Sequence, residues 1–264
     1  MLKLFTLLLF SLISCKKYFQ YSPNEVRLEE SEKNLNQKNI AKIQSLPTKD
    51  SFSFIVTGDT QRFYEELDEF VIHVNARNDI SFVIINGDIS DFGQNMEFKW
   101  IARSLAKLKI PYIAVIGNHD MLANGRQIFN QMFGPDNFSF SYGNYKFICL
   151  NSNSREKGFD GSLPDLNWLN TQLSQLSHSR QAFVFSHVPP FNQDFDQNLV
   201  QPFATALALS GKVNLSIHGH HTVFSISKPY GPDVEYVIAG SVNKNSYALI
   251  SVHNEFYNVR KVDF

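Results

Sequence analysis

The chain has 264 residues, of which 43% are hydrophobic and 14% are aromatic, and 24 basic against 25 acidic residues give a formal net charge of −1. This length and hydrophobic content suffice for one large core, and no internal repeat or second domain is evident. The balanced charge argues against nucleic-acid binding, and no polybasic stretch indicates binding to an anionic membrane. The two cysteines are far apart and form neither a disulfide framework nor a zinc pattern.

Residues 1–15 carry the pattern of a secretion signal. Lys3 gives a positive start, and residues 4–13 form an apolar run that is too short to remain as a membrane span. Cys15 ends a segment that resembles the lipobox of a bacterial lipoprotein, in which the cysteine is lipidated. The alternative is a chance cysteine after an ordinary signal peptide. We expect a lipid on Cys15 to anchor a soluble domain at the bacterial cell envelope, facing the periplasm.

Residues 16–49 contain many Asn, Gln, Glu, Lys and Ser residues and few large apolar ones. Such a composition is typical of a polar tether, within which residues 25–44 could form a solvated helix. Residues 50–264 then form the catalytic domain. This division predicts that the segment before residue 50 stays outside the fold.

The first half of the catalytic domain alternates short apolar runs with helical patterns. The runs predict buried strands over residues 52–57, 82–86 and 112–116. Between them, apolar residues at helical spacing predict helices over residues 64–77 and 94–108. An alternation of strands and helices implies parallel strands that are joined by right-handed crossovers.

The second half of the domain is richer in consecutive strands. It contains a predicted hairpin around Gly143-Asn144 and predicted helices over residues 163–176 and 199–209. Further strands are predicted over residues 138–142, 145–151, 182–185, 213–217, 223–226, 234–239, 246–252 and 256–259. Two mixed sheets that face each other, with helices outside, fit this order of elements.

A polar motif directly follows five of the predicted strands. The motifs are Gly58-Asp59-Thr60-Gln61, Gly87-Asp88, Gly117-Asn118-His119-Asp120, Ser186-His187 and Gly219-His220-His221-Thr222. Sheets that are covered by helices place their sites at strand ends, so we expect carboxylate, amide and imidazole side chains to meet there. Oxygen and imidazole ligands suit manganese, iron or zinc better than a metal that prefers thiolates.

Together the motifs resemble those of calcineurin-like metallophosphoesterases, which run Gly-Asp-x-His, Gly-Asp, Gly-Asn-His-Asp/Glu, a lone His and Gly-His-x-His. The resemblance extends from about Ser51 to the C-terminus, and the ordered set is more specific than any single motif. It implies an α/β/β/α sandwich of two mixed sheets with two divalent metal ions at the sheet edge. It also implies hydrolysis of a small phosphorylated substrate, whether a phosphomonoester, a phosphodiester or a pyrophosphate. Residues 151–163 and 191–197 are expected to line the pocket.

The resemblance further implies a role for each motif residue. Asp88 bridges the two ions, and Asp59 binds the first of them. His119 lies beside the leaving-group oxygen as a proton donor or electrostatic stabiliser, and Asp120 orients it. Asp91 is expected to be a supporting loop residue and not a direct ligand. The second ion is completed by Asn118, His187 and His220.

Two residues depart from the family pattern, and both belong to the first metal. Gln61 stands where most members have a histidine, and Thr222 stands where the last histidine belongs. His221 is one position out of register, which turns its side chain to the other face of an extended segment unless a bulge intervenes. We therefore expect a first site that is weak, filled only under metal excess, or built with water and His221. A binding or scaffold protein without turnover is the alternative function.

Overall fold

The computed structural model describes residues 22–49, 51–254 and 256–264. The expected signal segment with Cys15, and the first residues of the expected tether, lie outside the described residues. Within the described ranges, no helix combines the length and the apolar character that crossing a bilayer requires.

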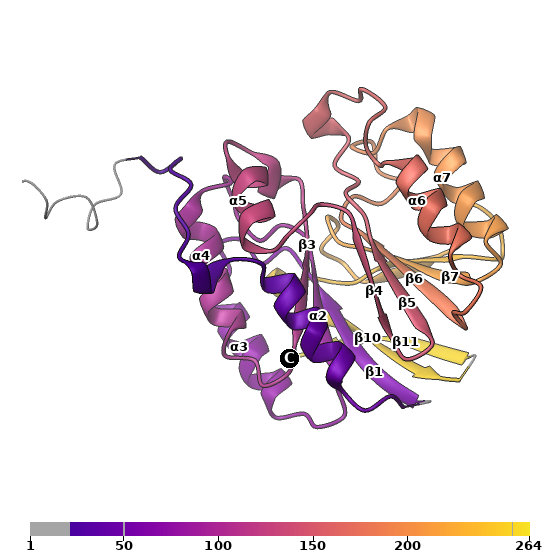
Figure 1. The fold of residues 1–264 in the computed structure, drawn as a ribbon, viewed down its shortest axis with the longest axis horizontal. Coiled ribbons are helices and arrows are strands. Elements are labelled where there is room, and N and C mark those ends of the chain that lie inside the picture. The colour runs from indigo at the N-terminus through magenta and orange to yellow at the C-terminus, as the bar shows by residue number, and fades with distance from the viewer. Residues whose placement is uncertain (1–21, 50, 255) are drawn as a thin grey trace, which may run out of the picture.

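Two β-sheets face each other in the middle of the molecule (Figure 1). The first has the strand order β11-β10-β1-β2-β3, and the second has the order β4-β5-β6-β7-β9-β8. The strands are β1 (Ser51–Thr57), β2 (Phe82–Asn86), β3 (Tyr112–Val115), β4 (Phe138–Tyr142), β5 (Tyr145–Cys149), β6 (Gln181–Ser186), β7 (Val213–His218), β8 (Ser225–Ser227), β9 (Glu235–Ile238), β10 (Ser246–His253) and β11 (Phe256–Asp263). The α-helices are α2 (Leu35–Ser45), α3 (Tyr64–Asn75), α4 (Asn95–Leu105), α5 (Gly125–Met132), α6 (Leu166–Ser174) and α7 (Gln197–Leu209).

The first sheet contains the predicted parallel core. β1 pairs in parallel with β2, and β2 with β3, while β10 and β11 continue the sheet in antiparallel fashion. Every residue of β2 is buried, because one face of this strand meets the helices and the other meets the second sheet. The carboxyl ends of β1, β2 and β3 consequently lie at one edge of the sheet.

The second sheet has the same kind of core. β5, β6, β7 and β9 run parallel to one another, and the edge strands β4 and β8 are antiparallel to their neighbours. Helices α6 and α7 cover its outer face, where Leu169, Phe203 and Leu207 are buried. The carboxyl ends of β6 and β7 therefore also lie together, and each precedes a predicted histidine ligand.

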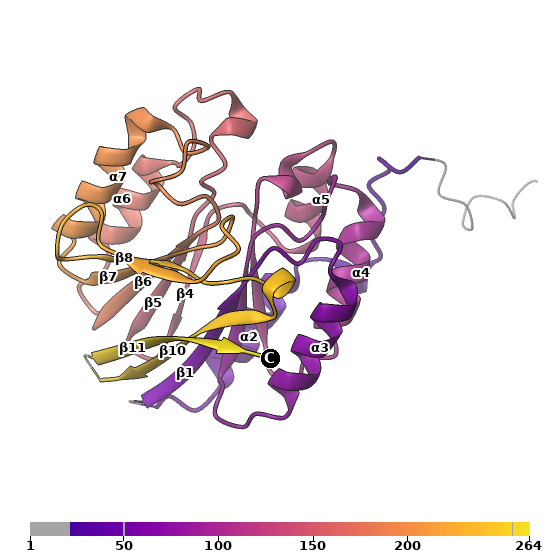
Figure 2. The ribbon, with the colours of Figure 1, turned by 180° about the vertical axis from the view of Figure 1, so that it is seen from behind.

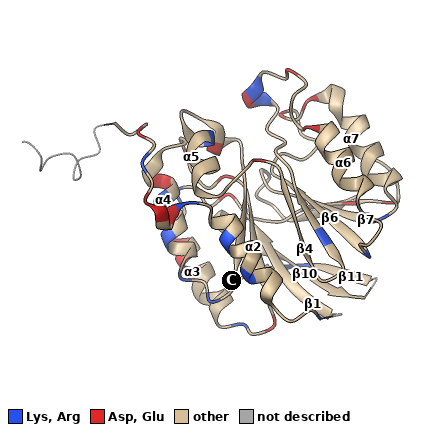
Figure 3. Cartoon of the chain, in the orientation of Figure 1, with Lys and Arg blue, Asp and Glu red and all other residues tan. Residues whose placement is uncertain are grey.

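Aromatic side chains fill the space between the sheets. Phe54 of β1 stacks on Phe82 with ring centroids 5.3 Å apart, and it meets Phe147 and Phe183 of the second sheet edge-on at 5.4 and 5.5 Å. Figure 2 shows α3 and α4 outside one sheet and α6 and α7 outside the other. The predicted α/β/β/α sandwich is thus confirmed. Charged residues of both signs lie on α4, whereas the segments of α6 and α7 contain none, as Figure 3 shows.

The residues before β1 differ from the expected tether. Helix α2 lies along β3, and its residue Ile43 is fully buried in the core between the sheets. The Asn36 side chain accepts a hydrogen bond from the Ala114 backbone N–H and donates one to the Ala114 carbonyl, both at 2.8 Å. The side-chain amide thus occupies the edge of β3 as a neighbouring strand would. The prediction that residues 22–49 stay outside the fold is wrong, because composition does not show which few residues reach the core.

Candidate metal centre

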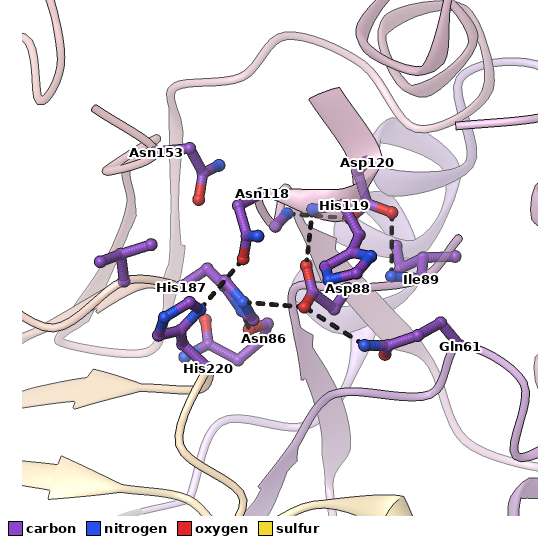
Figure 4. A network of polar contacts seen from close by, with 12 residues as sticks. Gln61, Asn86, Asp88, Ile89, Asn118, His119, Asp120, Asn153, His187 and His220 are labelled. Atoms are coloured by element: carbon purple, nitrogen blue, oxygen red, sulfur yellow. Dashed lines mark hydrogen bonds and ion pairs between the residues drawn. The ribbon is translucent and has the colours of Figure 1, made fainter. Parts of the chain in front are cut away.

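The carboxyl ends of strands from both sheets meet at one place (Figure 4). Asn86, the last residue of β2, joins the sheets, because its side-chain amide donates to the carbonyls of Ser186 at 3.2 Å and Ile217 at 3.1 Å. Its backbone carbonyl accepts a hydrogen bond from His187 Nδ1 at 2.8 Å. Asn86 is absent from the site residues predicted from the sequence, although a buried polar residue that ends an apolar run was a usable signal.

Three of the predicted ligands have left-handed backbone conformations. The φ angles of Asp59, Asp88 and His220 are 51°, 55° and 65°. This region is uncommon for residues with a side chain and persists only where the surrounding structure fixes it. Each of these residues follows a glycine at the end of a strand, so the chain turns sharply there and keeps the motif at the shared edge.

The motif glycines allow these turns to pack against each other. A Cβ atom on Gly87 would lie 2.2 Å from His187 Nδ1, and one on Gly117 would lie 2.1 Å from the Asp88 backbone nitrogen. A Cβ atom on Gly219 would lie 2.9 Å from the same histidine nitrogen. Such distances are below van der Waals contact, so close packing around the histidine and the carboxylate requires glycine at these three positions.

Asp59, Asp88 and His187 form a compact, buried group. One potential ligand atom from each residue lies within 4.8 Å of the other two. His187 Nε2 is 3.2 Å from Asp88 Oδ2. Because His187 Nδ1 donates its proton to the Asn86 carbonyl, a neutral ring keeps its lone pair on Nε2, which is then free to bind a cation.

Asn118 and His220 lie next to this group. Asn118 Oδ1 is 3.0 Å from His220 Nδ1, and the rings of His187 and His220 meet edge to face with centroids 5.4 Å apart. Burial lowers the pKa of His220 to about 4, so that its ring is neutral near pH 7. A neutral imidazole and an amide oxygen at this separation can bind one cation together.

Several polar atoms of the centre lack a hydrogen-bond partner among the described residues. Among them are Asp59 Oδ2, Gln61 Oε1, Asn86 Oδ1 and His187 Nε2, all of which are buried. Burial and the neighbouring Asp88 carboxylate raise the pKa of Asp59 to about 7. Burial disfavours a charged His187, but the two carboxylates outweigh burial and raise its pKa to about 10. A divalent cation in place of that proton would satisfy both carboxylates, so these residues fit such an ion.

A model of the calcineurin-like phosphoesterase family matches residues 52–224. The chain belongs to this family. It is 30% identical over 127 residues to a probable glycerophosphodiester phosphodiesterase of Arcobacter nitrofigilis, an alignment that covers 46% of each protein. It is 33% identical over 116 residues to the human serine/threonine-protein phosphatase CPPED1, which covers 40% of this chain and 36% of that protein. The chain thus aligns with less than half the length of these curated relatives.

Solved structures share the fold of this calcineurin-like phosphoesterase. A dimetal phosphatase from Danio rerio has a TM-score of 0.62 at 15% sequence identity, over 80% of this chain and 97% of that one. The purple acid phosphatase PPD1 from yellow lupin has a TM-score of 0.63 at 11% identity, over 81% of this chain and 52% of that one. At these identities the likeness concerns the fold alone. Membership of the family supports the binding of divalent metals without identifying them.

One motif residue of this phosphoesterase has a different contact from the one expected. The fully buried Asp120 carboxylate accepts hydrogen bonds at 2.7 to 2.9 Å from three backbone N–H groups. The donors are Ile89, Ser90 and Gly117. His119 instead donates from Nδ1 to the Asp91 backbone carbonyl at 2.8 Å, and Asp91 Oδ1 is 3.5 Å from the same nitrogen. The prediction that Asp120 orients His119 is wrong. The Asp120 carboxylate instead links the loop after β2 to the loop after β3 by hydrogen bonds, and the His119 ring is oriented by Asp91.

Gln61, which replaces the usual histidine of the first motif, lies inside the centre. Its Nε2 donates to Asp88 Oδ2 at 3.3 Å, and its Oε1 is buried without a hydrogen-bond partner among the described residues. An amide oxygen in this position can bind a cation beside Asp59, although more weakly than an imidazole does.

His221 does not take the place of the missing last histidine. Its Nε2 is 3.0 Å from the Asn192 side-chain nitrogen, and its ring stacks on Phe191 with centroids 6.3 Å apart. His221 therefore faces the loop after β6 and is not part of the compact group around Asp59. Of the alternatives for the first site, this placement favours a site that is weak or filled only under metal excess over one built with water and His221.

Proposed function

We propose that this protein hydrolyses the ester bonds of a small phosphorylated substrate with two divalent cations, for which manganese, iron and zinc are the best candidates. The observation that carries the proposal is the convergence of motifs from both sheets on Asp59, Asp88 and His187, whose ligand atoms lie within 4.8 Å. Family membership and relatives named as a phosphodiesterase and a phosphatase support it. The oxygen and imidazole donors of the centre suit these metals.

Each half of the centre offers its own donors, and Asp88, which contacts both Gln61 and His187, would help to hold both cations. The first cation would be held by Asp59 and by the unpartnered Oε1 of Gln61. The second would be held by Asn118 Oδ1, His187 Nε2 and His220 Nδ1. When bound, the cations supply charge neutralisation of the phosphate oxygens and lower the pKa of a water molecule.

We infer that His119 gives a proton to the leaving group. Its Nδ1 donates to the Asp91 carbonyl, so the second proton of a charged ring lies on Nε2. The His119 side chain is 33% exposed, whereas the Asp91 side chain beside it is 6% exposed and can offset the positive charge of the ring. As the leaving-group oxygen departs, Nε2 would transfer its proton to that oxygen and the ring would become neutral.

Hydrolysis of p-nitrophenyl phosphate and bis(p-nitrophenyl) phosphate tests this proposal. Protein that has been stripped with a chelator should show no turnover, and added Mn²⁺ or Zn²⁺ should restore it. Asp233→Asn, which changes an exposed carboxylate, is the matched control and should respond like the wild type. A protein that binds metal but hydrolyses none of a panel of phosphorylated compounds would contradict the proposal and favour the scaffold alternative.

We further propose that the protein acts outside the cytoplasm and is attached to the cell envelope by a lipid on Cys15. The support is the sequence pattern of residues 1–15. Cys15→Ser should release the protein from the membrane fraction or leave it with an unprocessed signal segment. Recovery of the wild-type protein wholly in the soluble periplasmic fraction would overturn this location.

A further inference from the structure

The two histidines of the proposed second site are turned in opposite directions. His187 donates from Nδ1 to the Asn86 carbonyl at 2.8 Å, which leaves Nε2 free to bind a cation. His220 has its Nδ1 inside the centre, 3.0 Å from Asn118 Oδ1. A cation that is shared with Asn118 would therefore be bound by His220 through Nδ1.

The other ring nitrogen of His220 faces a carboxylate that belongs to none of the sequence motifs. Asp194 Oδ2 is 3.4 Å from His220 Nε2, and the Asp194 side chain is 13% exposed. A neutral imidazole that binds a cation through Nδ1 must carry its proton on Nε2. An anionic oxygen beside Nε2 stabilises this tautomer relative to the one in which Nδ1 carries the proton.

Asp194 is itself held by contacts from two loops. Arg155 Nη1 lies 3.2 and 3.3 Å from its two carboxylate oxygens, and the Arg155 backbone N–H donates to the Asp194 carbonyl at 3.3 Å. The Asp194 backbone N–H donates to Asn192 Oδ1 at 2.7 Å. These contacts join the loop after β5 to the loop after β6 and keep the carboxylate against His220.

We propose that Asp194 is a positioning residue of the second metal site. It holds His220 in the tautomer with the proton on Nε2, so that Nδ1 faces the cation, and Arg155 keeps Asp194 in place. This inference rests on the proposed function, because it requires a cation beside Asn118. It gives the loop over residues 191–196 a part in metal binding that the motifs alone do not indicate.

Titration of the metal-free full chain with Zn²⁺ tests the proposal in three variants. Asp194→Ala should weaken zinc binding at the tighter site by about 10- to 100-fold, the usual cost of losing such a partner. Asp194→Asn should weaken it less, because the amide oxygen still accepts a hydrogen bond. Asp233→Ala changes an exposed aspartate in the loop between β8 and β9 and should leave the affinity unchanged. Weaker binding in an Asp194→Asn protein that unfolds at the wild-type temperature would separate positioning from folding.

Nitrogen-15 NMR of histidine-labelled protein reports which ring nitrogen of His220 carries the proton. A purely structural role of Asp194 would not change this. The His220 signals, assigned with His220→Gln, should show zinc on Nδ1 and the proton on Nε2 once zinc is added. In the metal-free protein Asn118 Oδ1 favours a proton on Nδ1 and Asp194 favours one on Nε2, so Asp194→Ala should shift the metal-free ring toward the tautomer with the proton on Nδ1.

Unchanged zinc affinity and an unchanged His220 tautomer in Asp194→Ala would overturn the proposal, as would zinc bound to Nε2 in the wild type. Failure of the proposed function would look different from either result. The wild type would then hydrolyse no phosphate ester, while the tautomer of His220 would still depend on Asp194.

Discussion

The two halves of the candidate metal centre differ in how completely their donors are fixed. On the second side, His187 is oriented by a backbone carbonyl, and His220 lies between Asn118 and the half-buried carboxylate of Asp194. On the first side, Gln61 offers an amide oxygen where the family pattern has an imidazole, and this oxygen and Asp59 Oδ2 are buried without a hydrogen-bond partner among the described residues, as His187 Nε2 is on the second side. One half has thus kept its imidazoles and their supports, whereas the other relies on a carboxylate and an amide. If the proposed function is correct, this difference predicts that the two sites bind metal with unequal affinity.

Asp88 belongs to both halves, and its substitution should have the largest effect. Asp88→Asn removes the negative charge that two cations would share, so we expect turnover to fall to the background rate and metal content to decrease. Metal analysis and ester hydrolysis of the purified variant measure both quantities. Wild-type turnover of Asp88→Asn at low metal concentration would rule out a shared carboxylate.

His119 tests whether the chemistry can be separated from metal binding. His119→Asn should leave the metal content nearly unchanged and reduce turnover by roughly 10²- to 10⁴-fold if proton donation is lost. The loss should be smaller for nitrophenyl esters than for alkyl esters, since good leaving groups need little protonation. Equal losses for the two kinds of ester would argue against His119 as the acid.

Thr222 offers a way to remove the difference between the halves. The Thr222 carbonyl accepts a hydrogen bond from Ser241 Oγ at 3.3 Å. The residue after Ser241 is Val242, and its backbone N–H donates to the Gly58 carbonyl at 3.1 Å. This segment therefore lies beside the first motif, and Thr222→His should strengthen the weaker site about tenfold, or about 1.4 kcal/mol. Calorimetric titration with Mn²⁺ measures the change, and Thr205→His on the α7 surface is a control that should leave it unaltered. A higher Mn²⁺ affinity at the tighter site instead would show that Thr222 does not lie beside the first metal site.

The pH dependence of the stabilisation by metal should reveal how much stability the metal-free protein loses when the buried Asp59 ionises. Burial and Asp88 raise the pKa of Asp59 to about 7, above its ordinary value of 3.8. Its contribution to the stability of the metal-free protein is full below that ordinary value and is lost as the pH rises through 7. A cation at Asp59 offsets this loss, so added Mn²⁺ should raise the unfolding temperature by a few degrees more at pH 8 than at pH 5. Asp59→Asn should remove most of the difference between the two pH values. An equal rise in the unfolding temperature at both pH values in the wild type would contradict this role of Asp59.

The strand-end part of the site was predictable from the sequence, because it depends on local patterns. An apolar run over residues 82–86 followed by Gly87-Asp88 is enough to place a carboxylate at the end of a buried strand, and β2 has the predicted bounds. The same reasoning predicted that β1, β2 and β3 run parallel to one another.

The features that were missed depend on contacts between distant segments. Asn36 reaches β3 by pairing with Ala114, 78 positions away, and its polar surroundings in the sequence suggest a tether instead. Asp194 contacts His220 because Arg155, in the loop after β5, pairs with it in the loop after β6. Asp120 was given the wrong partner because neighbours in a motif need not be neighbours in space. Helix α5 was not predicted, since its eight residues are too few for a clear helical period.

Calorimetric titration of the metal-free wild-type protein with Mn²⁺ tests the inequality of the two halves most directly. We predict one tight binding event at the side of Asn118, His187 and His220, and a second, weaker event that involves Asp59 and Gln61. His220→Gln should weaken the tight event and spare the weak one, which assigns the two events to their sides. Two equally tight events in the wild type would contradict this account and would require a further ligand beside Asp59.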